Sequence, residues 1–158
     1  MLREGTSGGY SRNDLLAILW AAGRGSLLGG AVGFVAGHFG FRHPIEGALI
    51  AALIGANVAG ALTGLRPLPV TLIISSIIAG IAIAGGVAGA TVVLWGLSVG
   101  GIAAGIATGR LFTLDALFDP QPRPDYFAIM LVAGALGALA GGWWLLRRVA
   151  RWVARDTL

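Results

Sequence analysis

Few residues in this chain could carry chemistry, and none of them form a recognisable catalytic constellation. The 158-residue sequence has no cysteine and no HExxH or P-loop motif, so the best-known metalloprotease and phosphate-binding signatures are absent. No Asp or Glu lies inside an apolar stretch, where proton-coupled and cation-coupled transporters usually hold an acidic group. We therefore expect that the protein is not an enzyme.

One histidine lies where a cofactor could bind. His38 is the only ionisable residue well inside an expected membrane crossing, and His43 follows it across a turn. Neutral imidazole is a good axial ligand for haem or chlorophyll, so His38 is a candidate cofactor ligand. A b-type haem usually takes two facing histidines, and the sequence has no second mid-membrane histidine. We favour an interfacial histidine that is bonded to loop carbonyls or water, and the sequence identifies no cofactor.

Uncharged polar residues also lie within the apolar stretches, and the candidates among them are Asn57, Ser75 and Ser76. Near the bilayer midplane they could form a substrate or ion site. An amide in hydrocarbon needs a hydrogen-bond partner, and a bond between two helices there contributes about 0.6 to 2 kcal/mol. We favour such interhelical hydrogen bonds over a transport site.

A basic segment follows the last apolar stretch, and its cations are Arg147, Arg148, Arg151 and Arg155. Arginines at a membrane surface attract anionic headgroups at about 1 kcal/mol each. We expect this segment to anchor the chain to the lipid bilayer, with docking of an acidic partner as the alternative. The net charge of +4 comes from the ends of apolar segments, so we expect no nucleic-acid partner.

Small residues recur every four positions in several stretches, which is typical of glycine zippers. Close backbone approach drives helix association in lipid, and small residues permit it. We expect them to pack the protein's own helices together, with self-association as the alternative. The glycines of the pattern are Gly29, Gly33, Gly37, Gly47, Gly55, Gly101, Gly105, Gly109, Gly137 and Gly141.

The composition of the chain indicates which secondary-structure elements hold these candidate residues. Hydrophobic residues make up 56% of the chain and charged residues 11%, against about a quarter charged in soluble domains. A crossing helix needs about 20 apolar residues. The composition therefore predicts an all-α, polytopic integral membrane protein with about five hydrophobic helices in a single membrane domain.

Caps and prolines place the boundaries of these helices. Ser11 and Asp14 fit a capping box before the first helix, and Pro44 fits the first position of the second. The 40-residue apolar stretch 70–109 has the length of two crossings, and its glycines favour a turn between 85 and 90. We expect helices over 12–41, 44–65, 69–88, 90–110 and 126–154, with a loop over 111–125.

The arginines predict the topology. Cytoplasmic ends collect Arg, and both ends of this chain carry several. Two cytoplasmic ends require an even number of crossings, whereas five helices make an odd number. We therefore expect four or five full crossings, with the C-terminus in the cytoplasm. The absence of Lys among the 11 basic residues favours a prokaryotic inner membrane.

Three functions remain open. The first is a non-enzymatic structural or accessory protein, such as a subunit of a larger membrane complex. The second is a small transporter or channel with a midplane polar site. The third is a haem- or pigment-binding subunit that uses His38.

Overall fold

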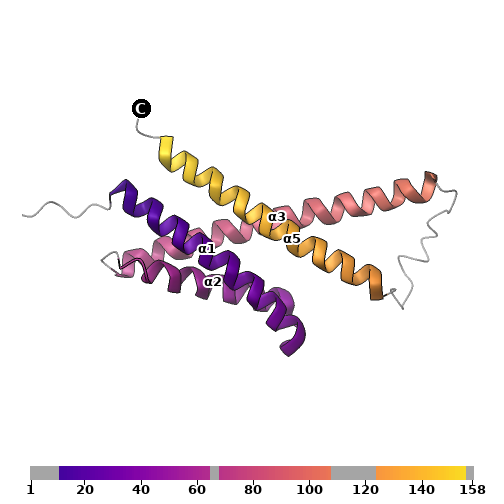
Figure 1. Ribbon diagram of the computed structural model, residues 1–158, viewed down its shortest axis with the longest axis horizontal. Coiled ribbons are helices and arrows are strands. Elements are labelled where there is room, and N and C mark those ends of the chain that lie inside the picture. Colours follow the sequence, from indigo (N-terminus) through magenta and orange to yellow (C-terminus); the bar gives the residue numbers. More distant parts are fainter. Residues whose placement is uncertain (1–10, 65–67, 108–123, 156–158) are drawn as a thin grey trace, which may run out of the picture.

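The computed structural model describes residues 11–64, 68–107 and 124–155, and these fold into helices and the turns between them (Figure 1). An all-α fold is therefore confirmed for the described part of the chain. The elements are α1 (Arg12–Ala36), a π-helical turn (Gly37–Phe41), α2 (Pro44–Ala61), α3 (Leu68–Ala107) and α5 (Pro124–Arg155).

The first helix begins at the predicted capping box. The backbone N–H of Asp14 donates to the Ser11 hydroxyl at 3.2 Å, and the Ser11 N–H donates to the Asp14 carboxylate at 3.0 Å. The two side chains satisfy backbone donors that the first helical turn leaves free. This prediction from the sequence is confirmed.

A tight turn joins α1 to α2. The last residues of α1 continue into the π-helical turn, and Arg42 then takes a left-handed conformation with φ of 59°. The His43 N–H donates to the Gly37 carbonyl at 3.0 Å, which closes the turn. Pro44 is the first residue of α2, as its missing N–H predicts.

The predicted turn between residues 85 and 90 is wrong. A single helix, α3, replaces the two expected over 69–88 and 90–110. Glycines at 85 and 89 contact α5 instead of ending a helix, and no proline interrupts the stretch. An α-helix pairs its own backbone N–H and C=O groups, so it continues where no residue forces it to stop.

Four of the described helices are long and apolar enough to cross a membrane. They replace the five that the sequence predicted. The spans are Arg12–Gly40, Pro44–Ala61, Leu68–Gly100 and Ala128–Arg155. The expected loop 111–125 lies outside the described residues up to 123, and α5 already begins at Pro124.

The helices form two antiparallel hairpins. Figure 1 shows α1 and α2 side by side, and it shows α3 and α5 crossing near their middles. Since the described helices alternate in direction, the start of α1 and the end of α5 lie at the same end of the molecule. At 1.5 Å per residue the 40 residues of α3 extend about 60 Å, roughly twice the hydrocarbon thickness.

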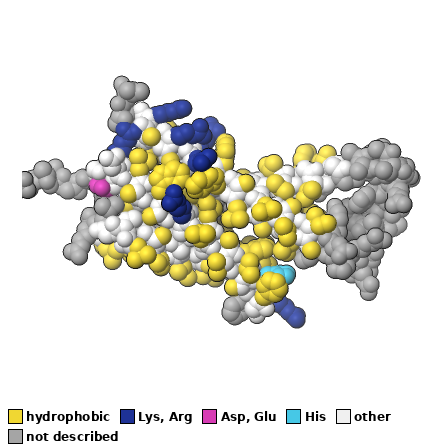
Figure 2. Space-filling view, in the orientation of Figure 1, with side chains coloured by type: hydrophobic (Ala, Val, Ile, Leu, Met, Phe, Trp, Pro, Cys, Tyr) yellow, Lys and Arg dark blue, Asp and Glu magenta, His cyan; other side chains and the backbone are white. Residues whose placement is uncertain are grey.

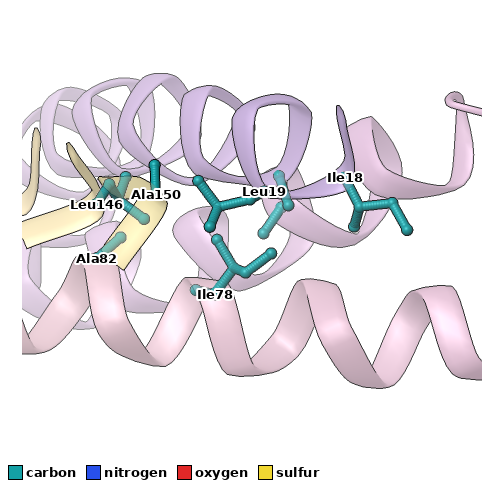
Figure 3. Close-up of a cluster of buried hydrophobic side chains, with 9 residues drawn as sticks. Ile18, Leu19, Ile78, Ala82, Leu146 and Ala150 are labelled. Carbon is teal, nitrogen blue, oxygen red and sulfur yellow. The ribbon is translucent and has the colours of Figure 1, made fainter. Parts of the chain in front are cut away.

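The core lies where three of these helices meet near that end, with one alanine from α2 (Figure 3). It is small, and most large hydrophobic side chains point outward instead (Figure 2). The buried side chains of the core are Ile18, Leu19, Ala22, Ala56, Ile78, Ala79, Ala82, Leu146 and Ala150.

Candidate functional site

Very close contacts join the glycines of α1 to the backbone of α2. A methyl group added to Gly25, Gly29 or Gly33 would overlap a carbonyl oxygen of residues 47–55. The contact is mutual, because a methyl group on Gly47 would lie 2.5 Å from the Gly33 carbonyl oxygen. These positions therefore have no room for any side chain.

The second hairpin has the same kind of contact. Gly85 and Gly89 of α3 face Gly141 and Gly137 of α5. A methyl group on Gly85 would lie 2.7 Å from the Gly141 carbonyl oxygen, and one on Gly137 would lie 2.9 Å from the Gly89 carbonyl oxygen. The two glycines of α3 are four residues apart, which is also the spacing of a helix-packing pattern. From the sequence we had predicted a turn there instead.

The other glycines of the predicted pattern lie elsewhere. Gly37 packs against the His43 carbonyl oxygen in the α1–α2 turn, where a methyl group would lie 2.7 Å from it. Gly101 and Gly105 belong to α3, but their surroundings lie outside the described part of the chain, as does Gly109 entirely. The predicted contacts of these last three residues stay predictions.

Asn57 and Ser76 meet between α2 and α3. The Asn57 side-chain amide donates to the Ser76 hydroxyl at 3.3 Å and to the Leu53 carbonyl at 3.0 Å. The Ser76 hydroxyl lies at the same 3.3 Å from the Asn57 carbonyl oxygen and can donate to it. Asn57 lies four residues before the end of α2 at Ala61, so the pair is closer to a helix end than to the middle.

Ser75 is fully buried on the neighbouring face of α3. Its hydroxyl has no hydrogen-bond partner among the described residues. It packs directly against Gly60 of α2, where any added methyl group would collide with it. The structure therefore places Ser75 and Ser76 on two different surfaces of α3, and only Ser76 contacts Asn57.

His38 lies in the π-helical turn that follows α1, whereas the basic segment forms the end of α5. Its side chain is exposed, and its ring meets the Phe39 ring edge-on at 5.0 Å between centroids. His43 lies 3.7 Å from Glu46, and both of these side chains are exposed. Within the described residues no group of three His, Asp or Glu side chains could hold a metal ion.

In the basic segment two arginines lie over the rings of neighbouring tryptophans. Arg147 lies 5.0 Å from the Trp143 ring centroid and Arg148 lies 5.3 Å from that of Trp144. Such cation–π contacts contribute about 0.5 to 1 kcal/mol at exposed sites. All four predicted anchor residues are exposed, including Arg151 and Arg155, so their charges are available to a partner.

The letters G-x-S-x-G do occur at Gly96–Gly100, around Ser98. A nucleophile elbow needs a sharp turn between a strand and a helix. Ser98 instead lies within α3, and its hydroxyl donates to the Leu94 carbonyl of its own helix at 2.9 Å. This serine therefore has the geometry of an ordinary helical residue.

No protein-family model matches the chain, and no match was found among curated proteins or solved structures.

Proposed function

We propose that this chain is a non-enzymatic, multi-pass membrane protein that serves as a structural or accessory subunit of a larger membrane complex. We further propose that glycine zippers hold its helices together in the bilayer. One observation carries the proposal: glycine backbones touch inside the molecule while large hydrophobic side chains face outward.

Residues 28–33 of α1 show this arrangement, with small residues inside the molecule and large apolar residues outside. Gly29 and Gly33 contact α2, whereas Leu28 and Val32 each expose 68% of their surface. A water-soluble protein buries its large apolar side chains, because removing them from water stabilises the fold. In lipid that driving force is absent between helices, and close backbone packing replaces it.

The polar contacts support a structural role. Asn57 and Ser76 bond to each other and to a main-chain carbonyl, so their polar atoms are engaged in holding α2 to α3. A transport site would instead need these groups free to bind a substrate. The geometry thus favours helix attachment over a midplane polar site.

For the topology we propose four crossings with both ends in the cytoplasm of a prokaryotic cell. Four helices satisfy the even number that arginine-rich ends demand, which five helices do not. The connection between α2 and α3 also carries Arg66 and belongs to the same side in this arrangement. Only Arg42, Arg110 and Arg123 then fall on the other side.

Purification from native membranes tests the proposal. Alkaline extraction should leave the protein in the membrane pellet, since peripheral proteins are released by such treatment. Mild detergent should then yield a reproducible complex larger than the chain itself. Release at alkaline pH would contradict membrane integration, and a lone monomer from every detergent would contradict the subunit role.

A further inference from the structure

Two helices meet through a pair of tryptophans near the basic end of the bundle. The rings of Trp20 in α1 and Trp143 in α5 lie 5.4 Å apart at an angle of 53°. Each tryptophan has an arginine four residues later in its own helix, Arg24 and Arg147. Residues four apart lie on one face of a helix. Because α1 and α5 run in opposite directions, the two arginines lie on opposite sides of the tryptophan pair.

The charges of these two arginines are available. Both side chains are exposed, and in Figure 2 arginines gather over this end of the molecule. The guanidinium of Arg147 lies 5.0 Å from the Trp143 centroid, which orients it while its N–H groups stay free for a ligand. Among the described residues neither Arg24 nor Arg147 pairs with an acidic side chain, whereas Glu46 lies beside His43 in the turn at the other end of α1. An external anion is therefore the natural partner of Arg24 and Arg147.

An apolar track leads away from the pair. Leu28 and Val32 continue the ridge of Trp20 and Arg24 along α1, and both are largely exposed. Tryptophans are enriched where the hydrocarbon meets the headgroups. With the Trp20–Trp143 pair at that level, Arg24 lies on the hydrocarbon side and Arg147 on the aqueous side. A ligand that fits this surface has an anionic head and apolar chains.

We propose that Arg24 and Arg147 bind the phosphate headgroup of one anionic phospholipid across the Trp20–Trp143 pair, with its acyl chains along Leu28 and Val32. Guanidinium groups bind phosphate with two parallel hydrogen bonds. The site differs from general attraction by the C-terminal arginines, because it requires a cation from α1. It rests on the proposed membrane embedding.

Brominated lipids test the site, since bromine quenches tryptophan fluorescence at short range. The full chain with Trp95→Phe, Trp144→Phe and Trp152→Phe retains only the tryptophan pair. It is reconstituted in phosphatidylcholine bilayers that contain a minor fraction of brominated phosphatidylglycerol or of brominated phosphatidylcholine. We expect the anionic lipid to quench more strongly. Each arginine should contribute about fivefold to this preference.

Substitutions then locate the site. Arg24→Gln and Arg147→Gln should each lower the preference about fivefold, and Arg42→Gln, at the other end of α1, should leave it unchanged. A melting temperature measured in detergent checks that each variant is folded. Where a glutamine variant fails to fold, the corresponding methionine variant, Arg24→Met or Arg147→Met, replaces it, because methionine keeps a long apolar stem without the charge.

Equal quenching by the two lipids would overturn the site while leaving the membrane embedding intact. Quenching by neither lipid would overturn the embedding itself. An unchanged preference in a folded Arg24→Gln variant would also overturn the site, because general attraction by the other arginines would then explain the binding. Displacement of the brominated lipid by a soluble polyglutamate peptide would assign the surface to acidic proteins and overturn the proposal as well.

Discussion

Gly33 of α1 and Gly47 of α2 touch so closely that a methyl group on either one would collide with the carbonyl oxygen of the other. Contacts of this kind are possible only where both residues lack a side chain. They permit dispersion contacts between the two main chains and weak Cα–H···O bonds, which hold helices together when the surrounding medium is as apolar as the side chains.

Alanine at Gly29 should destabilise the protein, because the added methyl group would collide with the Ala51 carbonyl. Overpacking of this kind costs about 1 to 3 kcal/mol. Gly80 is the matched control, since it is helical and has nothing near its missing side chain. Gly80→Ala should be neutral or stabilise by up to about 1 kcal/mol. The unfolding free energy in mixed detergent micelles measures both, and equal effects would contradict a glycine-specific contact.

The crossing of α3 and α5 allows the same comparison between a packed glycine and an exposed one. Gly89→Ala should lower the unfolding free energy by about 1 to 3 kcal/mol, because its methyl group would overlap the Gly137 carbonyl. Gly96→Ala, further along α3 in open space, serves as the control. A folded Gly89→Ala protein of unchanged stability would show that the two helices do not cross here.

Gly60 and Ser75 should respond in opposite directions. Gly60→Ala would place a methyl group on the Ser75 hydroxyl and should destabilise by about 1 to 3 kcal/mol. Ser75→Ala removes a buried hydroxyl that no described residue bonds, so it should be neutral or stabilise by about 1 kcal/mol. The same unfolding measurement applies. A loss of stability in Ser75→Ala would reveal a hydrogen bond to this hydroxyl.

Asn57 and Ser76 should be energetically coupled. A double-mutant cycle of Asn57→Leu and Ser76→Ala should give an interaction energy of about 0.5 to 1 kcal/mol, which is typical of hydrogen bonds within membranes. Pairing Asn57→Leu with Ser98→Ala supplies the control, because Ser98 bonds only a carbonyl of its own helix. Additive effects in the first cycle would mean that the bond does not hold α2 to α3.

The topology can be read with single cysteines, because the chain has none of its own. Ser11→Cys and Ala154→Cys should react with a membrane-impermeant maleimide from the cytoplasmic side of oriented vesicles. Gly40→Cys, in the α1–α2 turn, should react from the other side. Labelling of positions 11 and 154 from opposite faces would contradict four crossings.

The sequence predicted single elements well where one local feature decides them. The capping box at Ser11 and the helix start at Pro44 depend only on neighbouring residues, and both were confirmed. The turn between 85 and 90 was wrong because a glycine pair has two uses. It can end a helix, or it can admit another helix, and only the position of α5 distinguishes them.

For the candidate site, too, the sequence identified single residues but not the contacts between them. Asn57 and Ser76 were both identified as polar residues in apolar helices, but nothing in their 19-residue separation shows that they bond to each other. The Trp20–Trp143 contact joins residues from opposite ends of the sequence. Each tryptophan was visible alone, whereas the pair exists only after folding.

By itself the sequence determined that the described chain is helical and apolar enough to cross a membrane, because length, hydropathy and charge are sums over neighbouring residues. Only the tertiary structure decided which small residues touch and how many separate helices the apolar stretches make. Those outcomes depend on contacts between distant segments, and a repeating pattern of Gly and Ala is compatible with many pairings. Here Gly33 lies against Gly47, and Gly89 lies against Gly137.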